Sequence, residues 1–211
     1  PFKEGLKIQL VNHTSKEVIL NVTGNSPALS DEMFYLVNMH RGEVLFYQSF
    51  KMEGVNKVFK FENSSLKPGI NKMILLDKTF NPVSERLLFS RNFEMNNLLV
   101  ETDRKVYDKR SEIKLFINDE QFLDKAEFSN LLVYVVHEYV VSENGFSKNI
   151  LSQFLIDSEL EGFVESSADL FQDSEISSEA KLRLLMLTTG TQNYFWNSAP
   201  GKLDGVPFTQ E

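Results

Sequence analysis

The stretch Leu6-Lys7-Ile8-Gln9-Leu10 alternates apolar and polar side chains, and Val18-Ile19-Leu20-Asn21-Val22 does the same on its even positions. A period of two places one face of a β-strand on a core and the other face in water. Further runs of strand length follow at residues 33–39, 43–50, 55–61, 72–76 and 86–90. No window here keeps the helical period of 3.6 residues for three turns, so seven strands are predicted.

Turn residues separate these runs. Arg41-Gly42 predicts a tight hairpin, and the Gly-Asn-Ser-Pro sequence of residues 24–27 interrupts another pair of runs. Pro68-Gly69 and Asn81-Pro82 mark two more connections. Seven short strands at this spacing are typical of an antiparallel β-sandwich of immunoglobulin size, about 100 residues long.

A second sandwich is predicted beyond a boundary near residues 92–97. Apolar runs at residues 98–102 and 113–117 open it, and a strongly apolar strand follows at residues 131–136, extending to 141. Six consecutive apolar residues, Tyr134 included, predict that both faces of that strand are covered. The predicted organisation is therefore a sandwich at 1–94, a second sandwich with a helical elaboration at 95–197, and a linker at 198–211.

The helical elaboration is predicted over residues 180–189. Ser177 is the expected N-cap, Glu179 lies in the first turn, where the helix dipole favours a carboxylate, and Gly190 follows the end. Leu184 and its leucine neighbours leave little polar face, so this helix is expected to pack on most of its sides. A chain that starts at Pro1 without a signal peptide is expected to be a fragment of a larger protein.

Composition excludes several classes of function. Acidic residues number 30 against 22 basic ones, and a formal charge of −8 disfavours bulk binding to nucleic acid. No apolar run approaches the roughly 18 residues needed to span a bilayer. The chain has no cysteine, which excludes disulfides, cysteine-ligated zinc, iron–sulfur clusters and thiol chemistry.

Catalytic and metal-binding patterns are sparse. His13, His40 and His137 share no ligand-type spacing. The pair His137-Glu138 has the residue types of a base and its orienting group, but no Gly-x-Ser-x-Gly nucleophile motif accompanies it. The chain is therefore predicted to be no enzyme, with no catalytic residue, no metal ligand and no cofactor.

An acidic cluster and an aromatic run each allow two interpretations, one as a binding site and one as a structural feature. The alternating Asp157, Glu159 and Glu161, followed by Asp169, Asp173 and Glu175, would suit calcium or a solvated acidic strand edge. The run Tyr194-Phe195-Trp196 would suit a sugar ring or buried packing, and the second is favoured because aromatic side chains mostly bury area.

Residues 100–107, Val-Glu-Thr-Asp-Arg-Lys-Val-Tyr, resemble the Thr-Asp-Lys-x-x-Tyr signature that opens a macroglobulin-like domain of the alpha-2-macroglobulin family. Residues 66–77 and 83–89 are similar to the preceding sandwich in large outer-membrane proteins of Gram-negative bacteria. In those proteins, such domains precede a plug and barrel of the TonB-dependent receptor type. The resemblance covers about residues 55 to 196. It departs at residues 190–194, Gly-Thr-Gln-Asn-Tyr, where the family reads Gly-Trp-Arg-Arg-Tyr.

The resemblance implies two tandem immunoglobulin- or macroglobulin-like sandwiches. It further implies a non-enzymatic, extracytoplasmic structural or docking module of a receptor-like protein, located in the periplasm or at the cell surface in association with the outer membrane. The expected partners are sibling domains of the same chain or another envelope protein. The alternative is a surface carbohydrate-binding or adhesive β-sandwich module. A hydrolase domain would require a pocket that joins His137 to a carboxylate.

Overall fold

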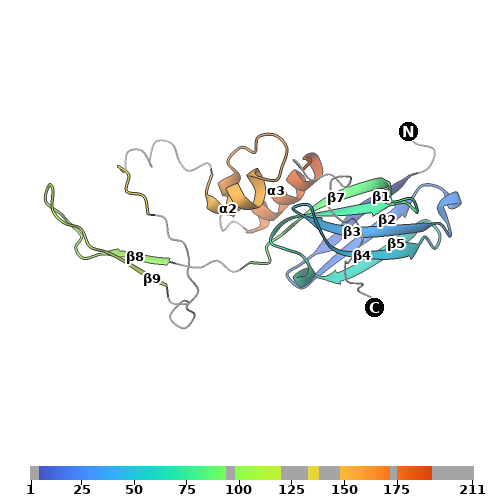
Figure 1. Cartoon of the computed structure of the whole chain (residues 1–211), viewed down its shortest axis with the longest axis horizontal. Coiled ribbons are helices and arrows are strands. Elements are labelled where there is room, and N and C mark those ends of the chain that lie inside the picture. Colours follow the sequence, from blue (N-terminus) through green and yellow to red (C-terminus); the bar gives the residue numbers. More distant parts are fainter. Residues whose placement is uncertain (1–4, 94–97, 120–132, 138–147, 172–174, 192–211) are drawn as a thin grey trace. The chain divides into compact units, whose positions relative to one another are not determined.

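The structure is a computed structural model that describes residues 5–93, 98–119, 133–137, 148–171 and 175–191. The chain divides into two compact units, and Figure 1 shows their elements. Unit 1 combines Pro1–Asn92 with Val141–Glu211, and unit 2 is Phe93–Val140.

Unit 1 contains a sandwich of two antiparallel sheets. Sheet A has the strand order β1-β2-β5, and sheet B has the order β4-β3-β6-β7. All seven strands of the sequence prediction are confirmed, and with them the mainly β, antiparallel fold class. Their bounds are β1 (Leu6–His13), β2 (Glu17–Gly24), β3 (Met33–His40), β4 (Glu43–Lys51), β5 (Asn56–Glu62), β6 (Gly69–Leu76) and β7 (Pro82–Ser90).

The predicted hairpin at Arg41-Gly42 connects β3 to β4. Both residues have positive φ, 48° and 84°, which is the backbone of a type I′ turn. This turn follows the right-handed twist of its strands, so β3 and β4 pair from His40↔Glu43 onward. Two short 3₁₀ turns, η1 (Pro27–Leu29) and η2 (Asn63–Ser65), complete the connections between strands.

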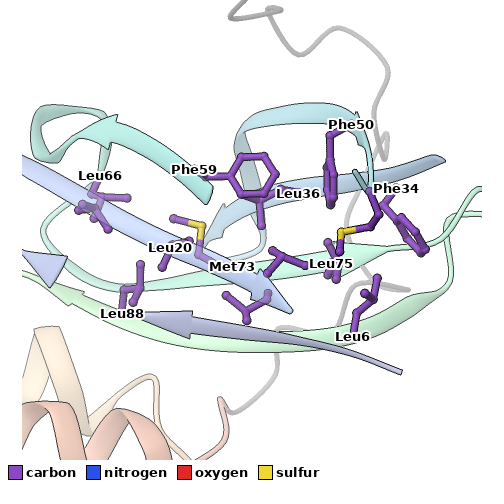
Figure 2. Packing of buried hydrophobic residues seen from close by; sticks show 14 residues of the cluster. Leu6, Leu20, Phe34, Leu36, Phe50, Phe59, Leu66, Met73, Leu75 and Leu88 are labelled. Carbon is purple, nitrogen blue, oxygen red and sulfur yellow. The ribbon is translucent and has the colours of Figure 1, made fainter. Parts of the chain in front are cut away.

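The main core lies between the two sheets. Figure 2 shows that the labelled side chains from both sheets point toward one another. Leu20 of β2 is fully buried, as are Met73 and Leu75 of β6. Phe50 stacks edge-on against Phe59 with ring centroids 4.8 Å apart, which joins sheet B to sheet A. Burial of alternate residues along each strand therefore holds the layers together.

A helical segment follows in unit 1. Its elements are α2 (Ile150–Ser152), the π-helical η3 (Gln153–Asp157), the 3₁₀ turn η4 (Ser167–Phe171) and α3 (Glu175–Thr188). The predicted short helix near the C-terminus is confirmed. It starts at Glu175, however, so Ser177 lies inside the helix and is not its N-cap. Figure 1 shows α3 lying beside β7.

The position of the helical segment differs from the predicted organisation, which assigned it to a second sandwich at 95–197. In the structure it belongs to unit 1. The physical reason is apolar packing: Ile156, Leu160 and Leu182 are buried against side chains of β6 and β7. The units divide between Asn92 and Phe93, and the boundary was predicted near residues 92–97. The predicted linker at 198–211 lies outside the described residues.

Unit 2 contains a two-stranded antiparallel sheet, β8 (Leu98–Thr102) with β9 (Leu115–Asp119). The strand predicted at 98–102 is confirmed, and the one predicted at 113–117 starts two residues later. The covered strand predicted at 131–141 is not found in its described part. Residues 133–137 form no strand, and Val135 is 93% exposed, because these residues pair with none of the described strands.

Candidate functional site

The outer face of sheet A is mostly polar, with the exposed Val58 among its side chains. Between the core residues of β1 lie the exposed Lys7 and Gln9. On the neighbouring strands, the Asn21 side-chain amide donates to Thr23 Oγ1 over 3.2 Å, and the Thr23 hydroxyl donates to Asn56 Oδ1 over 3.1 Å. This face is therefore a solvated surface of the kind that antiparallel sheets commonly present.

The outer face of sheet B is apolar and buried. The residues of β3, β4 and β6 that point away from the main core form a second cluster, which we call the outer-face patch. Its five core members have exposed fractions of 0 to 8%, although they lie on the outside of a sheet. The sandwich is therefore covered on this face. The patch consists of Val37, Met39, Tyr47, Ile74 and Leu76, with Tyr35 and Val44 packed against them.

The neighbouring part of the same face carries the helical segment. Ile70 of β6, with Leu87 and Phe89 of β7, forms what we call the cap seat, and the described residues 148–171 and 175–191 form the helical cap. All three seat residues are buried. The cap residues buried against them are Ile156, Leu160, Val164, Leu170, Leu182 and Met186.

One ion pair joins the cap to the β3–β4 hairpin. Arg41 Nε donates to Glu159 Oε1 over 2.8 Å, and Arg41 Nη2 donates to the carbonyl of Phe154 over 2.6 Å. The Glu159 side chain is only 3% exposed, whereas that of Arg41 is 43% exposed. A carboxylate this buried needs a cation, so Arg41 is the partner that allows Glu159 to lie under the cap.

Arg91, just after β7, joins the sandwich to the cap at a second point. Its Nη2 donates to the carbonyl of Leu170 over 2.7 Å, and its guanidinium lies 5.8 Å from the centroid of the Phe171 ring. The ring of Phe171 in turn meets that of Phe89 edge-on at 5.9 Å. The cap is thus held by apolar burial with charged contacts at its margin.

The end of the cap lies beside the outer-face patch. Lys72 is buried on β6, and its ammonium group is 2.8 Å from a Glu85 carboxylate oxygen and 3.5 Å from Thr191 Oγ1. Thr191 also forms an isolated β-bridge with Leu160. On the next strand, Lys72 is paired with Met39, a member of the patch. The cap therefore ends where the patch begins.

The acidic residues considered for calcium are separated in the structure. Glu159 is paired with Arg41, whereas Asp157 lies 3.4 Å from Lys148 Nζ and accepts a 2.7 Å hydrogen bond from Ser167. The Glu161 carboxylate lies against Gly190, where an added Cβ would be 3.2 Å from its Oε2. Among the described residues, no three His, Cys, Asp or Glu side chains group as metal ligands would.

The alternative interpretation, a solvated strand edge, is wrong for Glu159, which lies in the helical cap and is buried. Asp169 belongs to η4 and Glu175 starts α3, while Asp173 lies outside the described residues. Their alternation in the sequence is therefore not the period of a strand.

The histidines have structural contacts. His13 Nε2 is 2.9 Å from Asn63 Oδ1, and His40 Nδ1 is 2.9 Å from the carbonyl of Ile70. His137 lies in the described stretch 133–137, and Glu138, its predicted partner, lies outside the described residues. Tyr194-Phe195-Trp196 also lies outside them.

The Thr-Asp-Arg-Lys-Val-Tyr motif forms a compact turn after β8. Asp103 Oδ1 accepts hydrogen bonds from the Tyr107 hydroxyl over 2.6 Å and from the Lys114 backbone N–H over 3.0 Å. These bonds, that from Tyr107 first, lower the pKa of Asp103 to about 2. Lys114 is bonded to Asp103 of this turn, and β9 starts at the next residue, Leu115. The motif is a structural device that joins β8 to β9.

Some apolar side chains of the cap are exposed. Leu184 and Leu187 of α3 are 61% and 59% exposed, so the expectation that this helix packs on most sides is wrong. Its buried side is formed by Leu182 and Met186. None of the described helices is long and apolar enough to cross a bilayer.

Sequence reasoning missed the apolar outer face of sheet B. The signal was present in the runs Met73-Ile74-Leu75-Leu76 and Leu87-Leu88-Phe89, which do not alternate. Consecutive apolar residues in a strand indicate that both of its faces are covered. By contrast, no local pattern could pair Arg41 with Glu159, 118 residues away.

Comparisons with known proteins give little further information. No protein-family model matches the sequence, and no curated protein matches it. One solved structure that matches is described as a beta-glucuronidase from glycoside hydrolase family 2. It is 16% identical, with a TM-score of 0.26, over 44% of this chain and 12% of that chain. A likeness this weak assigns neither fold nor function, and the resemblance to macroglobulin-like domains stays a prediction.

Proposed function

We propose that this chain is a non-enzymatic structural or docking module, part of a large receptor-like protein of the bacterial outer membrane. The observation that carries the proposal is the outer face of sheet B, which holds a cap of short helices on the apolar cap seat. A sandwich with one polar and one apolar outer face is suited to hold a neighbouring segment in a fixed place.

The chemistry of the polar side chains supports a structural role. The carboxylates predicted as ligands serve the fold: Glu159 pairs with Arg41, and Asp157 with Lys148. Two of the histidines form hydrogen bonds that join separate parts of the sandwich. Asp103, with its lowered pKa, ties a turn together and stays ionised at neutral pH.

The location is tested by fractionating bacteria that express the protein from its natural gene. The proposal expects the protein in the outer-membrane fraction, in association with a larger chain or as part of one. Recovery in the cytoplasmic fraction would contradict it. The control is a cytoplasmic marker protein followed in the same fractions.

The carbohydrate-binding alternative is tested by native electrophoresis through gels that contain soluble polysaccharides. The proposed structural module migrates equally with and without polysaccharide. Retardation by one polysaccharide, relieved by the free sugar, would replace the proposal with the alternative.

A further inference from the structure

A small cleft lies where the edge of the sandwich meets α3. β1 and β7 are edge strands of the two sheets and contact each other, and α3 lies beside β7 (Figure 1). All three elements contribute to the walls of the cleft, which are mostly apolar. Two arginines also line it, Arg86 of β7 and Arg183 of α3. The strand and the helix thus each supply one cationic side chain.

The Arg86 side chain is not satisfied by the fold. Arg86 is paired with Met73 of the main core, and Leu88, two residues further along β7, also belongs to that core. Arg86 therefore starts on the core side of sheet B, at its edge. Its Nε atom is buried and has no hydrogen-bond partner among the described residues. A buried donor without an acceptor costs free energy, so an acceptor supplied from outside would stabilise this site.

The cleft also holds positive charge that no acid balances. Burial, and then the nearby charge of Arg183, lower the pKa of Arg86 below its usual value. Neither guanidinium forms an ion pair with a described carboxylate. Glu179, the carboxylate among the described lining residues, has its Oε2 3.9 Å from Arg91 Nε instead. The cleft is therefore locally cationic, although the whole chain carries a formal charge of −8.

We infer that this cleft binds a small oxyanion, of the phosphate or carboxylate class, through Arg86 and Arg183. Arginine presents its N–H groups as a planar fork that matches two oxygens of such an anion. An anion bound here gives Arg86 Nε its missing acceptor and offsets the repulsion between the two guanidinium groups. The enclosed part of the cleft has room for about one water molecule. The ligand therefore places only its charged oxygens between the arginines, and the rest of it lies toward solvent.

The first test follows the Nε–H signal of Arg86 in nitrogen-15 NMR spectra of the complete chain. Titration with sodium phosphate or sodium acetate, with sodium chloride holding the ionic strength constant, should shift this signal to a plateau. Arg183→Gln should weaken the binding about tenfold, the loss typical of one charge-assisted hydrogen bond. Lys181→Gln is the matched control and should bind as the native chain does, because Lys181 is an exposed cation of the same helix outside the cleft.

The two anions distinguish the possible sources of the ligand. A plateau with phosphate alone assigns a phosphate-type ligand, and a plateau with acetate alone assigns a carboxylate. A plateau with both assigns a site that accepts either, so each of these three results supports the inference. No plateau with either anion, or equal affinity in R183Q and the native chain, would overturn it.

A second measurement tests Arg86 itself. Arg86→Met keeps an unbranched side chain and removes the unpartnered buried charge. Replacing chloride by phosphate at constant ionic strength raises the melting temperature of most proteins through exclusion from their surface, and this contribution is common to the variant and the native chain. A bound anion adds a further rise in the native chain only. Equal rises in both proteins would contradict the inferred site.

Discussion

The two outer faces of the sandwich differ in what covers them. On sheet A, most outward residues are polar, and Val58 is 62% exposed. On sheet B, the outward residues are apolar and buried, and Ile74 has no exposed surface. The same sandwich thus has one outer face that is exposed to solvent and one outer face that is packed and buried.

The difference shows that a strand can have neighbours on both edges within its sheet and also be covered on both of its faces. β6 lies between β3 and β7 within its sheet, and between the main core and the outer layer across it, so all of its residues are buried. β5 is at the edge of sheet A and alternates exposed with buried or half-buried residues. Apolar burial on both sides stabilises β6 roughly in proportion to the area removed from water.

The largest expected effect contrasts one residue from each outer face. Ile74→Ala should lower the free energy of unfolding by about 2–5 kcal/mol, because it leaves a cavity under a covered surface. Val58→Ala should change it by less than about 1 kcal/mol, since Val58 is exposed. Both values are measured by urea denaturation. Equally small effects would show that the outer face of sheet B is not packed.

The next effect concerns the ion pair between the hairpin and the cap. Arg41→Ala should cost about 2 kcal/mol, less than the 3–5 kcal/mol typical of a fully buried pair, because Arg41 is partly exposed. Arg41→Asn controls for the positive φ of this residue, which asparagine tolerates. A double-mutant cycle with Glu159→Gln gives the coupling energy. A coupling near zero would mean that this pair does not hold the cap.

A smaller difference in stability is expected between alanine substitutions at two glycines with positive φ. Gly54, with φ of 77°, has open space where a Cβ would go. Gly69, with φ of 91°, would place its Cβ 3.3 Å from Leu155 Cδ2 in the cap. Alanine at either position should cost about 1–2 kcal/mol through the left-handed backbone. Gly69→Ala should cost about 1 kcal/mol more by overpacking, as thermal melts of both variants would show. Equal costs would argue against close packing of the cap.

The smallest effect lies outside the sandwich and serves as a contrast to it. The pKa of Asp103 is lowered from 3.8 to about 2, so its contribution is complete above pH 3.8 and is lost as the pH falls through about 2. Tyr107→Phe removes the strongest hydrogen bond and should raise this pKa toward its usual value. Carboxyl chemical shifts in an NMR titration measure it. An unchanged midpoint in the variant would refute the assigned cause.

The strands of unit 1 were predictable because their core-facing residues recur at a period of two, and their turns carry Gly, Pro and Asn. The packing of the helical cap on sheet B was not predictable from the sequence. It depends on contacts between distant residues, such as Arg91 with Leu170, that no local pattern encodes. The apolar run at 131–136 shows the limit of the rule for covered strands. Composition predicts burial there, whereas Val135 is exposed in the described structure.

The contrast between the two outer faces is tested most directly by thiol labelling of two single-cysteine variants, Ile74→Cys and Val58→Cys, in the native chain. The absence of natural cysteine removes any background. The structure predicts that I74C reacts at least about tenfold more slowly than V58C, because only transient opening exposes it. Equal labelling rates in the folded protein would contradict a covered outer face on sheet B.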